Sequence, residues 1–180
     1  MIKLGTKELP NLSSELTVKQ FSKVNEILAQ QIEPIEKWYQ IFESLGAIES
    51  EIDDLDFNQF KEIIKEFNSA ENKDTEIVQT LEIDGYTYKA FETEFKISIK
   101  DLKKIEKAVA EKPYHYIADM LAVVYKRTDL TNAEHYENAH IKHKAKLFSE
   151  LKANIALPIV WHVAKKLTET VENIEDDSVE

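Results

Sequence analysis

Three short stretches of the chain share one pattern of apolar and polar positions, and each is typical of the start of a helix. In each stretch an oxygen-bearing residue stands between two apolar residues, and a Gln or Asp follows three places later. The side-chain oxygen can accept from a backbone N–H of the first turn, while the residue three places on reaches back. Apolar residues then recur at helical spacing. The pattern predicts helices that begin at Thr17, Asp56 and Ser98 and extend to about Gln31, Phe67 and Val109.

A second helix is expected directly after the first. Pro34 suits the first turn of a helix, and Gly46 is a natural C-terminal stop. We expect the two helices to form a hairpin. After the helix capped by Asp56, residues 68–76 are polar enough to be a linker.

Further helices are expected in the last third of the chain. Pro113 is expected to start one of them, with Lys126 and Arg127 in its last turn, where cations suit the helix dipole. The apolar spacing over residues 133–155 predicts one long helix. Pro158 is expected to kink or interrupt this helix before its continuation over residues 159–167.

The segment from Leu81 to Tyr88 predicts a β-hairpin. Apolar and polar residues alternate on both sides of Asp84-Gly85, the kind of dipeptide preferred in two-residue type I′ turns. This turn places Ile83 opposite Tyr86 and Leu81 opposite Tyr88. We expect Phe95 and Ile97 to add a third strand, and Ile2 and Leu4 to form a short strand before a turn at Gly5-Thr6.

Composition favours long regular elements and few turns. The chain has 180 residues, 43% of them hydrophobic, with three Gly, four Pro and no Cys. It is therefore expected to be mainly α, a helical bundle with a small antiparallel β-hairpin or three-stranded sheet. The predicted parts are a helical lobe over residues 1–70 with a short β element, a lobe of hairpin and helices over 77–167, and a disordered acidic tail over 168–180.

The two predicted lobes align with each other in part. When residues 1–46 are laid on residues 80–125, Pro34 falls on Pro113 and Phe21 on Leu102. An internal duplication would explain this match. So would chance, because any two amphipathic helix pairs of similar composition match about as well.

Candidate catalytic and metal-ligating residues are few. His140 and His143 are three residues apart, and His135 lies five before His140, so the three histidines are the best metal candidate. The same stretch carries a packing stripe, which favours a structural role and predicts no metal site and no cofactor. Three scattered glycines do not form a phosphate loop, and the chain has no cysteine nucleophile. We expect a protein that is not an enzyme.

Large aromatic side chains give the better indication of function. Trp38, Tyr39 and Phe42 lie on one predicted helix, and Trp161 lies near the end of the chain. One interpretation is ordinary core; the other is exposed anchors that bind a partner protein. A net charge of −11 disfavours binding to nucleic acid and to anionic membranes. With no signal peptide or membrane span in the pattern, we expect a soluble protein in the cytoplasm.

Residues 81–157 resemble small proteins encoded in the tail gene clusters of tailed bacteriophages, namely tail assembly chaperones and baseplate-hub assembly proteins. The resemblance lies in the hairpin over 81–91, the capped helix from Ile97, the run from Pro113 to Arg127 and the helix from Tyr136 to Phe148. It implies a non-catalytic role, most closely that of a chaperone that binds hydrophobic segments of the tape-measure protein in the host cell.

Two alternatives to the chaperone stay open. One is a baseplate, neck or ring subunit that remains in the virion and contacts other tail subunits or further copies of itself. The other is a small acidic inhibitor of a nucleic-acid-binding enzyme, because an excess of carboxylates can replace phosphates on a basic surface.

Overall fold

The protein is mainly α, with two small antiparallel sheets. The computed structural model describes residues 2–10, 15–68, 76–90 and 97–177, without the side chains of Asn132 and 169–177. The elements of the first half are β1 (Ile2–Leu4), β2 (Lys7–Leu9), α1 (Val18–Leu28), α2 (Pro34–Ser44), α3 (Glu49–Asp53) and α4 (Phe57–Asn68). Those of the second half are β3 (Thr80–Ile83), β4 (Tyr86–Lys89), α5 (Ile99–Glu111), α6 (Tyr116–Val124), β5 (Lys126–Arg127), α7 (Asn132–His135), α8 (Asn138–Ser149) and α9 (Ala153–Asp177).

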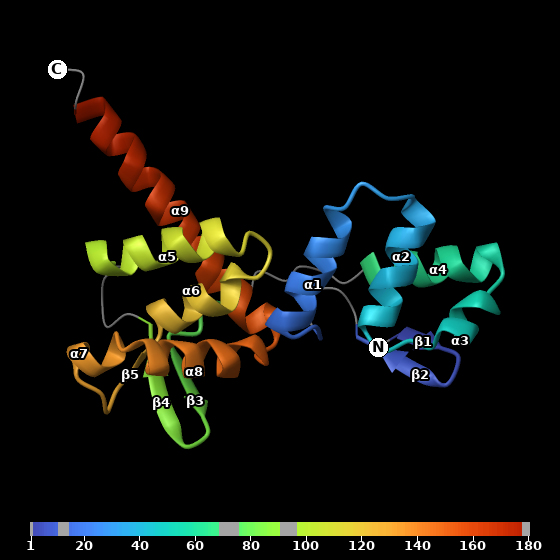
Figure 1. Ribbon diagram of the computed structural model, residues 1–180, viewed down its shortest axis with the longest axis horizontal. Coiled ribbons are helices and arrows are strands. Elements are labelled where there is room, and N and C mark those ends of the chain that lie inside the picture. The colour runs from blue at the N-terminus through green and yellow to red at the C-terminus, as the bar shows by residue number, and fades with distance from the viewer. Residues whose placement is uncertain (1, 11–14, 69–75, 91–96, 178–180) are drawn as a thin grey trace.

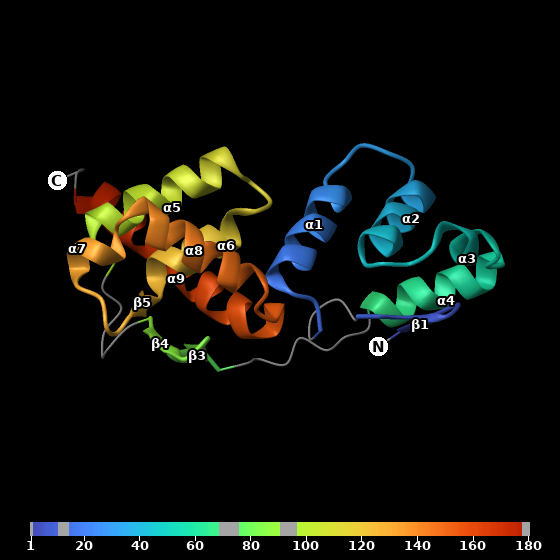
Figure 2. The same ribbon diagram turned by 60° about the horizontal axis from the view of Figure 1, so that its bottom comes forward.

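The elements gather into two groups with α1 between them (Figure 1). One group holds β1, β2 and α2 to α4, and the other holds α5 to α9 with β3 to β5 along one side. Figure 2 shows the same separation after a turn about the horizontal axis. Although α1 is close to α2 in sequence and in space, it also contacts α6, α8 and α9. The helix therefore joins the two groups.

The three helix starts predicted from the sequence are confirmed. Thr17 and Ser98 each form a capping box, in which the side-chain oxygen accepts from the backbone N–H three residues on and that residue's side chain accepts in return. Asp56 accepts from the N–H groups of Asn58 and Gln59 at 2.8 and 2.9 Å. These caps pair the N–H groups that the first turn of a helix leaves without intrahelical acceptors.

The predicted hairpin is also confirmed, with Leu81 opposite Tyr88 and Ile83 opposite Tyr86. Its turn places Asp84 and Gly85 at φ of 52° and 77°, the positive values that a type I′ turn requires.

The predicted third strand is wrong. β5 pairs with β4 instead, so that Arg127 lies opposite Tyr88. Ile97 lies outside every strand, and Phe95 lies outside the described residues. Because Lys126 and Arg127 pair with β4, they are not the last turn of a helix as predicted. A strand of two residues has no periodicity of its own, and only its partner β4 defines it.

Two predicted helix boundaries in the second half are also wrong. α5 ends at Glu111, and Pro113 lies in the turn before α6. Proline disfavours the helical conformation in the residue before it, and Lys112 accordingly has φ −141° and ψ 67°. The expected helix over 133–155 is divided into α7, α8 and the start of α9.

The break between α8 and α9 has a tertiary cause. The backbone N–H of Val18 donates to the carbonyl of Leu151 at 2.8 Å, and the N–H of Ala153 donates to the carbonyl of Leu16 at 2.7 Å. Thr17 and Lys152 thereby form an antiparallel bridge between distant parts of the chain. Backbone groups used in this bridge cannot also continue α8.

α9 runs through Pro158, so the proline does not interrupt the helix; a kink there stays a prediction. The helix continues to Asp177, within the range 168–180 of the disordered acidic tail, which also stays a prediction. The residues after Leu167 include strong helix formers such as Glu. The last part of α9 extends away from the other elements (Figure 1). Among the described residues, no helix is long and apolar enough to cross a membrane.

One cluster of buried apolar residues runs through both groups of elements. Its largest fully buried side chains include Phe42 and Phe67 in the first half and Tyr88, Tyr125 and Phe148 in the second. Each half begins with a hairpin, a capped helix and a second helix, in the same order. An internal duplication would produce this order. Two unrelated helix pairs of similar composition could show the same order by chance, so the duplication remains a prediction.

Candidate functional site

Two regions have side-chain arrangements that go beyond ordinary packing. One is a buried polar cluster under α5, α7 and α8. The other is an exposed apolar surface at the open end of the hairpin formed by α1 and α2.

The buried polar cluster is centred on Asp101, the third residue of α5. One carboxylate oxygen of Asp101 accepts from the Tyr136 hydroxyl at 2.6 Å, and the other accepts from the Ser98 hydroxyl at 2.7 Å. The Lys126 ammonium lies 3.7 Å away. Burial raises the pKa of Asp101, but the hydrogen bonds from Tyr136 and Ser98 outweigh it, so that the pKa is lowered overall. The carboxylate is therefore ionised. Its contacts with Tyr136 and Lys126 connect α5 to the end of α7 and to β5.

Lys144 and His135 form the second part of the cluster. The Lys144 ammonium lies 2.8 Å from Nδ1 of His135 and donates to the Tyr125 carbonyl at 3.1 Å. Nε2 of His135 is 3.3 Å from the Val123 carbonyl. Since a carbonyl can only accept, Nε2 carries the proton and Nδ1 accepts from Lys144. Burial lowers the pKa of His135 to about 4 and that of Lys144 to about 7.

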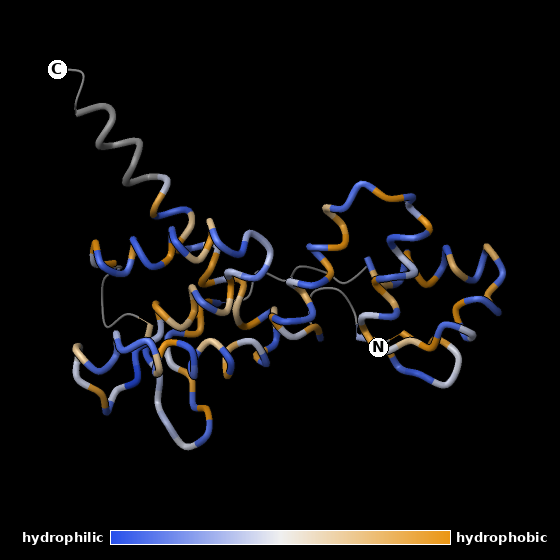
Figure 3. Tube along the Cα trace, in the orientation of Figure 1, coloured by the Kyte–Doolittle hydropathy of each residue, from blue (hydrophilic) through white to orange (hydrophobic). Residues whose placement is uncertain are grey.

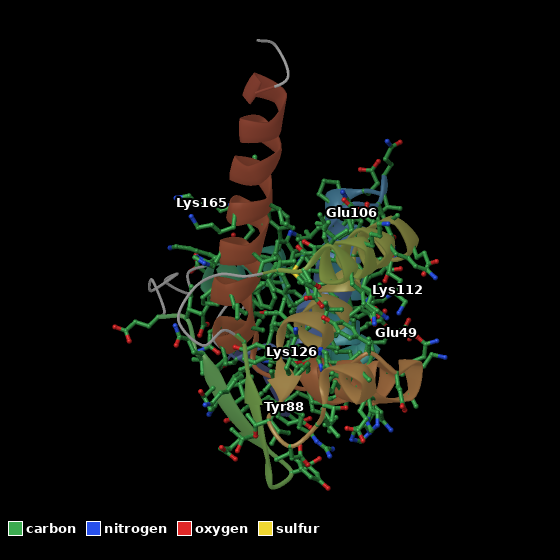
Figure 4. All side chains as sticks on the ribbon, turned by 90° about the vertical axis from the view of Figure 1, so that its left-hand side faces the viewer. Glu49, Tyr88, Glu106, Lys112, Lys126 and Lys165 are labelled. Carbon is green, nitrogen blue, oxygen red and sulfur yellow. The ribbon has the colours of Figure 1, made fainter. Side chains whose placement is uncertain are left out.

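This arrangement is that of a structural cluster. Both side chains are almost fully buried, and their polar atoms point to backbone carbonyls and to each other. The signal in the sequence was a lysine on the apolar stripe of a helix, with Ile141 three residues before Lys144 and Phe148 four residues after it. Lys144 was not among the residues predicted to form a site. Figure 4 shows Lys126, at the edge of the cluster, close to the sheet that carries Tyr88.

The three histidines weighed as metal ligands do not come together. His135 points into the core, whereas His140 lies 3.8 Å from Glu137 on the surface and His143 is exposed. Within the described ranges, no group of three or more His, Cys, Asp or Glu residues can hold a metal ion.

The four aromatic residues predicted as protein-binding anchors have different surroundings. Phe42 is fully buried, with its ring in edge contact with Phe60 and Phe67, so it is a core residue and not an exposed anchor. Trp38 is half-buried, with its ring 5.6 Å from that of Phe67. The Tyr39 hydroxyl lies 3.2 Å from a carboxylate oxygen of Asp53 in α3.

Trp161 alone of the four is mostly exposed, at 55%, on α9. α9 belongs to the other group of elements, so the structure does not bring Trp161 together with the three aromatic residues of α2.

The apolar surface that the structure does show lies at the connection between α1 and α2. Leu28 at the end of α1 and Ile35 at the start of α2 are exposed, Ile35 by 60%, and Ile32 between them is half-buried. Together with Gln31, Glu33 and Glu36, Ile32 and Ile35 line a shallow open groove. Figure 3 shows hydrophobic positions alternating with hydrophilic ones along this connection. We call these three residues, Leu28, Ile32 and Ile35, the apolar end.

Leu28 and Ile35 lie on the apolar stripes of their helices, and their exposure is not evident from the sequence. Each continues the stripe of its helix beyond the last turn that a neighbouring element covers. Periodicity shows which face of a helix is apolar, but it does not show how far along the helix that face is covered.

Comparison with known proteins gives no family for this chain. No family model matches it, and neither a curated protein nor a solved structure matches it. Its function is therefore inferred from its own residues.

Proposed function

We propose that this protein is a non-enzymatic assembly factor of tailed bacteriophages that binds a hydrophobic segment of another protein, as a tail assembly chaperone does. The observation that carries the proposal is the apolar end, where Leu28, Ile32 and Ile35 are left uncovered among the described residues. Exposed apolar side chains gathered at one place, with polar residues around them, are typical of protein-binding surfaces.

The polar residues around the apolar end define the kind of segment that fits. Glu33 and Glu36 flank Ile32 and Ile35 along the groove, and both carboxylates are exposed. A helix of the partner with an apolar stripe and basic residues beside it would bury the three apolar side chains and place positive charge near both glutamates. Tape-measure proteins of tailed phages enter the proposal through the resemblance of residues 81–157 to phage tail proteins.

The proposal is tested by co-expression with fragments of the tape-measure protein encoded by the same phage. The parent chain is expected to keep such a fragment in the soluble fraction. Ile35→Asp places a charge on the most exposed residue of the apolar end and is expected to weaken binding of the fragment about thirtyfold, the loss typical of an interface hot spot. Binding through the apolar end should fall only modestly with added salt, because burial of apolar side chains dominates and only two exposed glutamates contribute charge.

The matched control is Ile99→Asp. Ile99 on α5 is 74% exposed, more than Ile35, and lies in the other group of elements. This variant should recover the fragment as the parent does. Equal loss in both variants, or no loss in either, would contradict binding at the apolar end. A steep fall of binding with salt would favour the acidic inhibitor, and detection of the chain in purified virions by mass spectrometry would favour a virion subunit.

A further inference from the structure

A small polar pocket lies where α1, α6 and α8 meet, at the opposite end of α1 from the apolar end. Its volume is about 210 Å³. The residues that give it its chemistry are Lys19, Ser22, Lys112, His115, Asp119 and Lys146. They come from α1, from the connection between α5 and α6, from the first turn of α6 and from α8, so the pocket exists only in the folded chain. Lys112 is labelled in Figure 4.

The lining of this pocket is positively charged in a protein whose net charge is −11. Three lysines stand against one carboxylate, that of Asp119, which gives a net charge of +2 with His115 neutral. The Lys112 ammonium pairs with Asp119 at 2.7 Å. Lys19 and Lys146 form no ion pair with any residue in the described part of the chain. The ammonium groups of Lys19 and Lys146 are therefore available to bind an anion.

The first turn of α6 also faces the pocket. α6 is a nine-residue helix, and Ala118 and Asp119 of its first turn line the cavity. Its N-cap residue, His115, makes no side-chain cap, because the ring lies against Glu26, with Nε2 3.3 Å from a carboxylate oxygen. The N-terminal N–H groups of α6 therefore receive no side-chain cap, and Asp119 is the acidic residue of its first turn.

The Ser22 hydroxyl is the observation that points to a ligand. Ser22 is only 2% exposed and lines the pocket, and its hydroxyl makes no hydrogen bond to any described residue. Other serines in helices of this chain behave differently. The hydroxyls of Ser44 and Ser149 both donate to the carbonyl three residues earlier, at 2.7 Å. The Ser22 hydroxyl is thus free to donate, and an oxyanion in the pocket would accept from it.

We propose that this pocket binds a phosphate group, either as free phosphate or as a small phosphomonoester. A phosphomonoester carries a charge of about −1.5 to −2 at pH 7, which matches the net charge of the lining better than a carboxylate does. Ammonium groups, a serine hydroxyl and the N-terminus of a helix are the donors that phosphate sites use. The pocket is smaller than the roughly 300–1,000 Å³ of sites for drug-sized ligands, so the organic part of the ligand is small.

The proposal is tested by nuclear magnetic resonance titration of the full chain with inorganic phosphate at constant ionic strength. The backbone amides of residues 115–119 and of Ser22 are expected to shift and to saturate. A parallel titration with glycerol phosphate distinguishes the two ligands. Tighter binding of glycerol phosphate indicates a phosphomonoester site, and tighter binding of inorganic phosphate indicates a site for the free ion. Acetate at the same concentrations should give shifts that do not saturate.

Two variants separate a built site from general attraction to a surface. Lys19→Gln combined with Lys146→Gln is expected to weaken phosphate binding about tenfold or more, because charge-assisted hydrogen bonds are lost. Ser22→Ala is expected to weaken it severalfold with no loss of thermal stability, since no hydrogen bond within the described residues is removed. The matched control, Lys103→Gln on the exposed face of α5, removes one positive charge away from the pocket and should bind as the parent does.

The proposal fails if phosphate shifts do not saturate, if acetate binds as tightly as phosphate, or if the Lys103 control loses as much affinity as the pocket variants. Unchanged affinity in Ser22→Ala, with the chain folded, would also overturn the assignment of Ser22 to the site. None of these results bears on the apolar end, which lies at the other end of α1.

Discussion

Lys144 is a lysine in the interior of the protein, 2% exposed. Charged groups face it from three neighbouring elements: Asp101 and Lys104 of α5, His135 of α7, and Lys126 and Arg127 of β5. Burial is the main cause of its low pKa of about 7, and the positive charge of Lys126 adds to it. The low pKa makes the free energy of unfolding depend on pH, because the Lys144 ammonium loses its proton at a lower pH in the folded chain than in the unfolded chain.

The pH dependence has a definite sign. The unfolded chain holds the proton of Lys144 up to a pH near 10.4, and the folded chain holds it up to about 7. Unfolding between these values takes up a proton, so the free energy of unfolding rises with pH, by at most about 1.4 kcal/mol per pH unit. Urea unfolding from pH 7 to 9 should show this rise in the parent. In Lys144→Met the rise should be lost, while Lys142→Met, an exposed control, should keep it.

A pair of tyrosines tests how hydrogen bonding in the core affects stability. The Tyr88 hydroxyl is buried without a hydrogen-bond partner in the described part of the chain, whereas the Tyr125 hydroxyl donates to the carbonyl of Val78. Tyr88→Phe is expected to raise the free energy of unfolding by about 1 kcal/mol, because an unpaired buried hydroxyl is removed. Tyr125→Phe should lower it by a similar amount. Loss of stability in both variants, measured in denaturant, would show that Tyr88 has a partner after all.

At the scale of the element, the capping of α4 is the simplest to test because Asp56 is exposed. Asp56→Ala removes the acceptor of two backbone N–H groups and is expected to cost about 1 kcal/mol of stability. Asp56→Asn keeps an oxygen in the same place and should cost only a few tenths. Thermal unfolding of both variants checks the difference; equal losses would mean that the negative charge, rather than the cap, stabilises α4.

Features with local causes were predicted from the sequence. The caps at Thr17, Asp56 and Ser98 and the turn at Asp84-Gly85 each depend on residues within a few positions of one another. Features with distant causes were not. β5 depends on β4, which lies about 40 residues earlier in the sequence.

The candidate sites follow the same rule. Lys144 acquires its role from Tyr125 and His135, and the pocket acquires its charge from three helices that meet only after folding. Exposure at Ile35 likewise depends on where neighbouring elements end. A single sequence gives periodicity along each helix but not the partner that covers it.

The end of α9 is expected to be dispensable for folding of the complete protein. It extends away from the other elements, and residues after Leu167 include six carboxylates and no basic side chain. Stopping the chain after Leu167 should leave the thermal midpoint within a few degrees of the parent, while the helical signal in circular dichroism falls. A large drop in the midpoint, or strong amide protection over 169–177, would show that this part of α9 packs against the body or another subunit.

The bridge between Thr17 and Lys152 joins parts of the chain that are synthesised far apart in time. Residues 16–18 leave the ribosome early, but the carbonyl and N–H groups that pair with them belong to residues 151 and 153. At a translation rate of about 5–20 residues per second, the start of α1 waits several seconds or more for these partners. During that interval the apolar side chains of α1 that later pack against α6, α8 and α9 are exposed and can contact other nascent chains. Synthesis of residues 151–153, rather than of the first hairpin, is then the event that completes the start of α1.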